Sequence, residues 1–150
     1  MTAPVDYKDL ATLVGQEVGV SDWLQITQER VNQFADATGD HQWIHVDVER
    51  ATREIGGPIA HGYLTLSLIP FLAAGLMPVH GVTRGINYGS DKVRFTNMVR
   101  VGKRVRLRQK LLAVEAKSGG TQLKNQCTIE IEGEERPACV AETISVLYGA

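Results

Sequence analysis

The densest group of residues able to do chemistry is the segment 38–45, TGDHQWIH, which holds the acid Asp40 and the imidazole of His45. A carboxylate and an imidazole held close together can bind one water molecule, so that one group accepts its proton while the other delivers a proton to a substrate. The structural alternative is that Asp40 caps a turn and His45 is a buried, hydrogen-bonded histidine. The spacing alone favours this alternative.

Other common reaction centres have no counterpart in the sequence, which contains no GxSxG, CxxC, HExxH, GxxxxGK[ST] or GxGxxG motif. His41 and His45 are four residues apart, but Gly39 predicts a loop there rather than a helix face, so we expect no metal site. Cys127 and Cys139 are too few for a disulfide framework or a four-cysteine zinc site. We expect them to be small core residues on adjacent strands.

The segment that carries Asp40 and His45 lies between two predicted helices. Thr27 and Gly39 have the residue types that cap the two ends of the first helix. The second spans Val48–Ile55, begins after an aspartate and ends at two glycines. A loop held at both ends in this way can present the acid and the imidazole next to each other.

The middle of the chain, Ile55–Thr83, carries no Asp, Glu, Lys or Arg. Within it, Ile59–Met77 is long enough to cross a bilayer, but positive residues do not flank it in the way that topology signals require. We interpret it as a wholly buried core helix from Gly62 to Leu76, bent at Pro70 because proline lacks an N–H.

The remaining elements are strands. Alternation of apolar and polar residues predicts them over 17–26, 103–111, 122–131 and 138–148. Such patterns, joined by short turns, indicate an antiparallel sheet with one solvated face, and the uncharged helix is the candidate to cover the other face. The predicted fold class is therefore α+β, a long helix wrapped by a curved antiparallel sheet in one domain of residues 1–150.

Composition limits the partners. Apolar residues make up 43% and charged residues 22% of the 150 residues, as in ordinary globular proteins. The formal net charge is −1, which argues against a protein held to nucleic acid by its overall charge. Met1–Leu10 has no apolar region typical of a secretory signal. We expect a cytoplasmic protein with no membrane or nucleic-acid partner.

The segment Phe34–Ala51, FADATGDHQWIHVDVERA, resembles the hydratase motif of the MaoC-like (R)-specific enoyl-CoA hydratases. The matching positions are the aromatic Phe34, the Thr-Gly-Asp step ending at Asp40, His45 five residues later, and Ala51 six further on. Gln42-Trp43 stands where the family has Asn-Pro, and Ala37 is smaller than the usual aliphatic residue. These departures affect the loop between the two matched positions.

Two further matches extend the resemblance over most of the chain. Gly57–Gly62, GPIAHG, resembles the family's entry into its central helix, and Lys92–Phe95 resembles its KVRF-type strand. The family fold is the hot dog, in which a sheet wraps one long helix. The resemblance implies a homodimer whose sheets pair edge to edge, and an unpaired strand edge favours the same arrangement.

The resemblance also implies the reaction, syn addition of water to a trans-2-enoyl-CoA giving an (R)-3-hydroxyacyl-CoA, and its reverse, with no cofactor. By this resemblance Asp40 and His45 hold and activate the water. The backbone N–H of Gly62, at the start of the long helix, is the natural donor to the thioester oxygen, although a tight helix entry would also require glycine. Asn87 could reach a shared cleft, but ordinary strand polarity explains it equally well. We expect His61 to be a packing residue.

Two other functions are compatible with the fold. A thioesterase of this fold often carries a carboxylate on the central helix, and Gly62–Leu76 has none. A non-catalytic acyl-CoA-binding or stabilising subunit would tolerate the loss of Asp40 or His45, and both are present.

Nine of the 16 basic residues lie between Arg84 and Lys110. We interpret the alternating row in this stretch, Arg104, Arg106, Arg108 and Lys110, as a solvated sheet face. The better candidates for the CoA phosphates are Arg84, Lys92 and Arg94.

Overall fold

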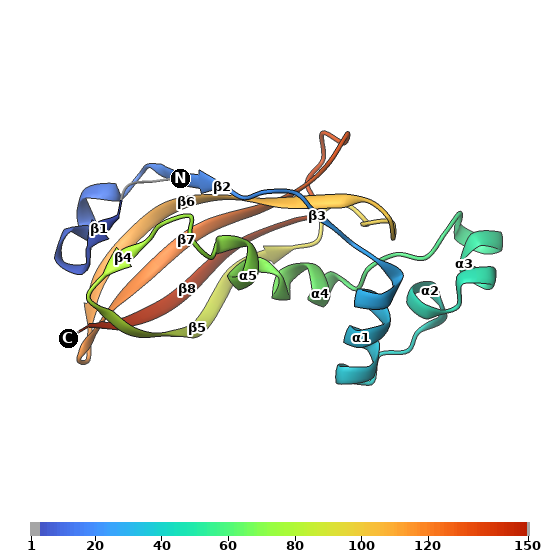
Figure 1. The fold of residues 1–150 in the computed structure, drawn as a ribbon, viewed down its shortest axis with the longest axis horizontal. Helices are drawn as coiled ribbons and strands as arrows, with labels where there is room; N and C mark the ends of the chain where they lie inside the picture. Colours follow the sequence, from blue (N-terminus) through green and yellow to red (C-terminus); the bar gives the residue numbers. More distant parts are fainter. Residues whose placement is uncertain (1–3, 150) are drawn as a thin grey trace.

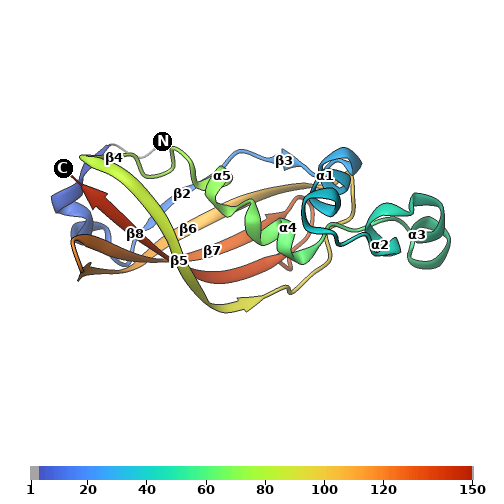
Figure 2. The ribbon, with the colours of Figure 1, turned by 90° about the horizontal axis from the view of Figure 1, so that it is seen from below.

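A long, strongly curved antiparallel sheet forms most of the molecule in the computed structural model, which describes residues 4–149 (Figure 1). Its strands follow the order β2-β6-β7-β8-β5, and β3 also pairs with β6. The strands are β2 (Glu17–Val20), β3 (Leu24–Gln25), β5 (Val82–Arg94), β6 (Arg104–Lys117), β7 (Gly120–Ile131) and β8 (Cys139–Gly149). The predicted α+β hot-dog architecture is confirmed, since helices lie on the concave face of this sheet (Figure 2).

The central helix is shorter than predicted and is divided. It consists of α4 (Gly62–Ser67) and α5 (Ile69–Ala73), which meet at Leu68. The division lies beside Pro70, which has no N–H for the helical ladder. The helix ends at Ala73 rather than Leu76, and Gly75 then takes a left-handed φ of 82° that turns the chain away.

The expectation of a wholly buried helix is wrong for this chain taken alone. Leu64, Leu68 and Leu72 are buried in the core against the sheet, whereas Tyr63 and Phe71 are 70% and 63% exposed on the opposite side. The helix therefore buries one face only. No helix within residues 4–149 is long and apolar enough to cross a membrane.

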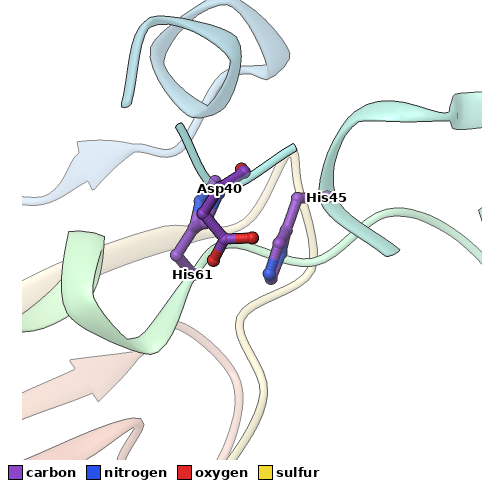
Figure 3. Close-up of side chains that lie close together, drawn as sticks. All are labelled: Asp40, His45 and His61. Carbon is purple, nitrogen blue, oxygen red and sulfur yellow. The ribbon is translucent and has the colours of Figure 1, made fainter. Parts of the chain in front are cut away.

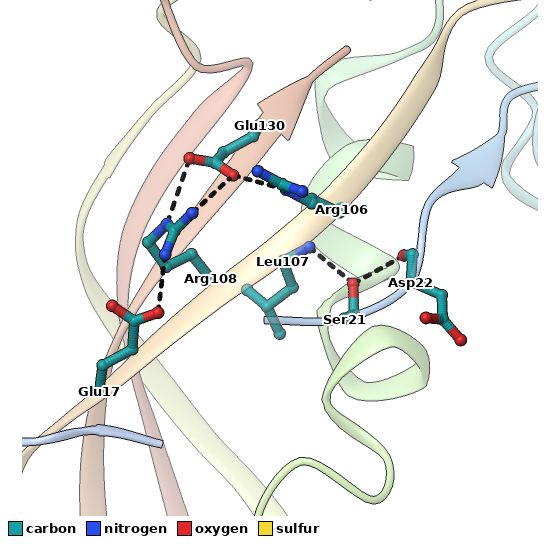
Figure 4. Close-up of polar contacts among 7 residues, drawn as sticks. All are labelled: Glu17, Ser21, Asp22, Arg106, Leu107, Arg108 and Glu130. Atoms are coloured by element: carbon teal, nitrogen blue, oxygen red, sulfur yellow. Dashed lines mark hydrogen bonds and ion pairs between the residues drawn. The ribbon is translucent and has the colours of Figure 1, made fainter. Parts of the chain in front are cut away.

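Several strand boundaries differ from the predictions. The segment 17–26 forms two short strands instead of one. Between them the Ser21 N–H donates to the Leu107 oxygen, but the Leu107 N–H donates to the Ser21 side-chain Oγ at 2.9 Å, which interrupts the ladder (Figure 4). The resemblance to a KVRF strand falls at the end of the much longer β5. Three small elements near the ends of the sheet were not predicted: β1 (Val5–Asp6), the 3-10 helix η1 (Tyr7–Leu13) and β4 (Val79–His80).

The outer face of the sheet carries the basic row, and acids on neighbouring strands pair with most of it. Arg106 and Arg108 both bind Glu130, and Arg108 also binds Glu17 at 2.7 Å (Figure 4). These two arginines are half-buried rather than exposed. The row therefore lies on a partly solvated sheet face whose arginines form ion pairs with acids, which agrees with its interpretation from the sequence. On the inner face, Cys127 on β7 and Cys139 on β8 are buried, and burial raises the pKa of the Cys139 thiol to about 11.

Candidate active site

The elements around the dyad follow the predicted caps. Helix α1 (Gln28–Thr38) begins where Thr27 Oγ1 accepts a hydrogen bond from the Arg30 N–H, and it ends at Gly39 with a left-handed φ of 84°. Two short helices follow, α2 (Trp43–Val46) and α3 (Val48–Ile55), and both lie beyond one end of the sheet (Figure 1). The predicted loop over 38–45 is therefore helical in its last part. Trp43 is only half-buried, with the Arg50 guanidinium 4.1 Å from its ring centroid.

His45 is held with one ring nitrogen free. It is 6% exposed, and its Nδ1 lies 2.6 Å from the backbone oxygen of Ile59. A carbonyl only accepts hydrogen bonds, so Nδ1 carries the proton and Nε2 keeps a lone pair. The Ile59 N–H in turn donates to the oxygen of Ile44 at 3.0 Å, which fixes the acceptor beside the imidazole.

Asp40 lies next to this imidazole. The side chains of Asp40, His45 and His61 each place a nitrogen or carboxylate oxygen within 4.8 Å of the others, and Figure 3 shows the three clustered together. Asp40 is exposed, and its Oδ1 accepts a hydrogen bond from the Gln42 N–H at 3.3 Å. The structure therefore brings together the acid and the imidazole that the sequence paired.

His61 has a larger part in the site than the sequence suggested. Its ring is 2% exposed, stacks on His45 with centroids 3.8 Å apart, and is flanked by Phe34 at 4.8 Å. Its Nε2 donates to the backbone oxygen of Asp40 at 3.0 Å, which leaves the buried Nδ1 with no hydrogen-bond partner among residues 4–149. One side chain thus contacts both members of the dyad.

The electrostatics of the site favour a neutral His45. Burial lowers the pKa of His45 below its usual 6.5, and the proximity of His61 acts in the same direction. The hydrogen bond to Ile59 and the charge of Asp40 oppose this shift but do not reverse it. Near pH 7 the imidazole is therefore a free base whose Nε2 can accept a proton.

The same three side chains are the nearest approach to a metal site in the described part of the chain, but their geometry does not suit one. The two imidazole planes are 23° apart and stacked. Lone pairs lie in the ring plane, so two nearly parallel rings direct them side by side rather than toward one ion. The arrangement serves proton transfer better than coordination.

Gly62 lines the same cavity as His45, which has a volume of about 370 Å³. It is the first residue of α4, and the N–H groups of a first helical turn have no helical acceptor. A Cβ at this position would lie 3.0 Å from the Phe95 ring, so the position requires glycine. Arg136, which the sequence reading missed, also lines this cavity and is exposed.

Asn87 is not brought to the dyad. It lies on β5 and lines a second cavity of about 750 Å³ between the central helix and the sheet. The candidate phosphate cations lie along the same strand and are all exposed. Arg84 lies over the Tyr148 ring at 4.2 Å, Lys92 pairs with Glu142 at 3.2 Å, and Arg94 donates to the neighbouring backbone oxygen of Val93.

Comparison with known proteins agrees with this geometry. The chain is 55% identical over 138 residues to the 3-hydroxyacyl-thioester dehydratase Z of Mycobacterium tuberculosis, covering 91% of each chain. It is 44% identical over 146 residues to the nodulation protein N of Rhizobium meliloti, covering 95% of this chain and 91% of that protein. The fold matches that of an (R)-hydratase from A. caviae with a TM-score of 0.72 at 24% identity, covering 88% of this chain and 94% of that one.

Residues 9–133 match the MaoC like domain family, a span that includes the dyad, the central helix and the whole of β5, β6 and β7. The match therefore contains every element that positions Asp40, His45 and Gly62. On these grounds the chain belongs to the MaoC-like dehydratase family and is a hydro-lyase.

Proposed function

We propose that the protein catalyses the reversible syn addition of water to a trans-2-enoyl-CoA, giving an (R)-3-hydroxyacyl-CoA. The observation that carries the proposal is the free Nε2 of a neutral, buried His45 beside the Asp40 carboxylate. This pair supplies one proton acceptor and one anion side by side, and His45 lines a cavity. The 3-hydroxyacyl thioester in the name of the mycobacterial relative has the same chemical class as the proposed product.

Both new bonds of a syn addition can be made from this one point. A water molecule between the two groups loses a proton to His45 Nε2 as its oxygen attacks C3 of the enoyl chain. The imidazolium then gives that proton to C2 on the same face, and the Asp40 carboxylate stabilises the transient positive charge. In the reverse direction His45 removes the C2 proton and returns it to the departing hydroxyl group.

The negative charge that develops on the thioester oxygen needs a donor. We propose the N–H of Gly62, because it lines the same cavity as His45 and lies at the start of the central helix. Because Gly62 has no side chain, the Phe95 ring packs directly against this position. This contact with Phe95 explains why the position requires glycine, and the backbone N–H is the group that we propose as the donor.

For the carrier of the acyl group we propose CoA. Four exposed arginines make no ion pair with a carboxylate in the described part of the chain. Arg53 lies on α3, and the other three are our candidates for the phosphates: Arg84, Arg94 and Arg136. Arg136 is the nearest of these to the dyad, since it lines its cavity. The two cysteines are unpaired thiols, which suits a reducing cytoplasm as the place of the reaction.

We further propose a homodimer. The outer edge of β5 has no partner strand within residues 4–149, and an unpaired edge of 13 residues is a template for pairing. Ile86 and Tyr88 on this strand are 50% and 63% exposed, as residues of an uncovered interface would be. Sedimentation at micromolar concentration should give a dimer, and a monomer would contradict the proposal.

The activity is tested by a spectrophotometric assay on the purified protein. Hydration of crotonyl-CoA removes the absorbance of the conjugated thioester, and we expect turnover in both directions. A thiol reagent in a parallel assay reports free CoA, which would instead indicate hydrolysis. Binding without turnover would indicate a non-catalytic acyl-CoA-binding subunit.

A further inference from the structure

The larger cavity has an apolar wall on the helix side and a mixed wall on the sheet side, where Leu123 and Leu147 lie among polar residues. Its volume is about 750 Å³, and α4–α5 and the segment that follows form the apolar side with Leu66, Ile69, Pro70, Ala73 and Met77. On the sheet side the polar groups are amides and hydroxyls. These polar residues are Asn87, Ser90, Gln109, Asn125, Thr143 and Ser145. A pocket made only for an alkyl chain needs no such wall.

Two of the polar side chains are buried without partners. Gln109 is 6% exposed and Asn125 is 7% exposed. Neither side chain makes a hydrogen bond to another residue in the range 4–149. Asn125 Oδ1 is fully buried, whereas the Gln109 amide and Asn125 Nδ2 keep some accessible surface. A buried amide without a partner is costly, so such groups in folded proteins call for a ligand, a water molecule or another explanation.

The two amides belong to one polar row on the concave face. Gln109 on β6 is opposite Cys127, two residues along β7 from Asn125. Asn125 is opposite Thr143 on β8, which is in turn opposite Ser90 on β5. Side chains at directly opposite and diagonal positions of one sheet face lie within reach of each other. The row therefore crosses the floor of the cavity.

This cavity and the one that His45 lines have no lining residue in common, but both lie along the central helix. The two share the central helix as a wall, because Thr65 lines the dyad cavity and Leu66 lines the larger one. Gly62 and Ile69 are about 10 Å apart along a helix. An acyl chain whose thioester lies at Gly62 can extend into the larger cavity.

We propose that this cavity selects acyl chains that carry a hydroxyl group remote from the thioester, with Gln109 and Asn125 as the specificity-determining residues. The proposal rests on the proposed function and names the substrate class of the same site. A hydroxyl both donates and accepts, so it pairs with either end of a carboxamide. A plain alkyl chain would fill the cavity and leave both amides desolvated and unpaired.

The first test compares trans-2-octenoyl-CoA with its ω-hydroxy derivative, with crotonyl-CoA as the short reference. We expect the wild-type kcat/KM to be at least about 10-fold higher for the hydroxylated chain, because a site built around a substrate hydroxyl rejects the analogue that lacks it. Asn125→Leu and Gln109→Leu should each reduce that ratio toward one. Gln126→Leu, the next residue on β7 but exposed, should leave the ratio unchanged.

The second test needs no turnover. Titration calorimetry on the wild-type protein should give a Kd at least about 10-fold lower for ω-hydroxyoctanoyl-CoA than for octanoyl-CoA. Equal affinities, or a preference for the plain chain, would overturn the inference and indicate that water satisfies the amides. If crotonyl-CoA is not hydrated, the proposed function fails, and calorimetry still decides what the cavity selects. The thermal midpoint of Asn125→Leu should not fall, whereas loss of a structural amide would lower it.

Discussion

Replacing Gly62 with alanine tests the oxyanion donor without removing its N–H. The new Cβ would lie 3.0 Å from Cγ and Cδ2 of Phe95, whereas ordinary contacts begin at 3.4 Å, so the first turn of α4 or the ring must move by about 0.4 Å. Tyr63 packs edge-on against the same ring at 5.9 Å and restricts its movement. The substitution therefore displaces the N–H from the position that the thioester oxygen occupies.

The size of the effect follows from this displacement. A misplacement of 1 Å at a reacting centre costs about 100-fold in rate, so a shift of about 0.4 Å should lower kcat by about 5- to 10-fold. Overpacking costs about 1–3 kcal/mol, and the gain of up to about 1 kcal/mol from alanine in a helix offsets part of it. We expect the free energy of unfolding to fall by about 0–2 kcal/mol.

The assay is a double-mutant cycle on crotonyl-CoA hydration. Shortening the ring by Phe95→Leu makes room for the Cβ, so Gly62→Ala should cost much less kcat in that background than in the wild type. Gly89→Ala is the control for stability, because a Cβ there meets nothing within 4 Å. A Gly62→Ala variant that loses stability but keeps wild-type kcat would refute the role of this N–H.

The remaining predictions concern the dyad and the carrier. Asp40→Asn and His45→Gln should each lower kcat by about 10²- to 10⁴-fold, and the double variant should lose far less than the product of the two, because both groups act on one water; losses that multiply would contradict a shared water. Burial lowers the pKa of His45, so the acid limb of kcat/KM should lie below pH 6.5, the usual value for histidine. The unfolded chain binds the proton more readily, so stability should also decline as pH falls from 6.5 through the lowered pKa, and His45→Gln should remove that part of the decline in urea titrations. Arg84→Ala and Arg94→Ala should raise KM for the CoA substrate at constant kcat, less so at high salt, while Arg104→Ala should change neither constant; an unchanged KM in both would leave CoA recognition to other residues.

The parts of the site that the sequence predicted depend on residues close together in the chain. Thr27 and Gly39 cap α1 through contacts within one helical turn, and such signals are visible in a short segment. Asp40 and His45 lie in the same segment, between two helices whose ends could be located. Their proximity needed no knowledge of the sheet.

The parts that it did not predict depend on long-range packing. His61 stacks on His45 although it is 21 residues from Asp40, whose backbone it binds, and no periodicity reports such a contact. The sequence left open whether Asn87 reaches a cleft shared with the dyad or is an ordinary polar strand residue. In an extended strand, however, the eight residues from Asn87 to Phe95 span about 26 Å, which carries Asn87 into the other cavity.

The two ends of the projecting segment that holds α2 and α3 meet at one point. The Ile59 N–H donates to the oxygen of Ile44, and the Ile59 oxygen accepts a hydrogen bond from His45 Nδ1. Two residues before Ile59, Arg100 Nη1 donates a hydrogen bond to the Gly57 oxygen at 2.7 Å. These hydrogen bonds, and not the length of the chain through residues 46–57, orient the His45 imidazole. Doubling the length of a closed loop costs only about 0.6 kcal/mol, so insertions or a proteolytic nick in this segment leave the base where it is. New surface can be added there during evolution while the chemistry stays the same.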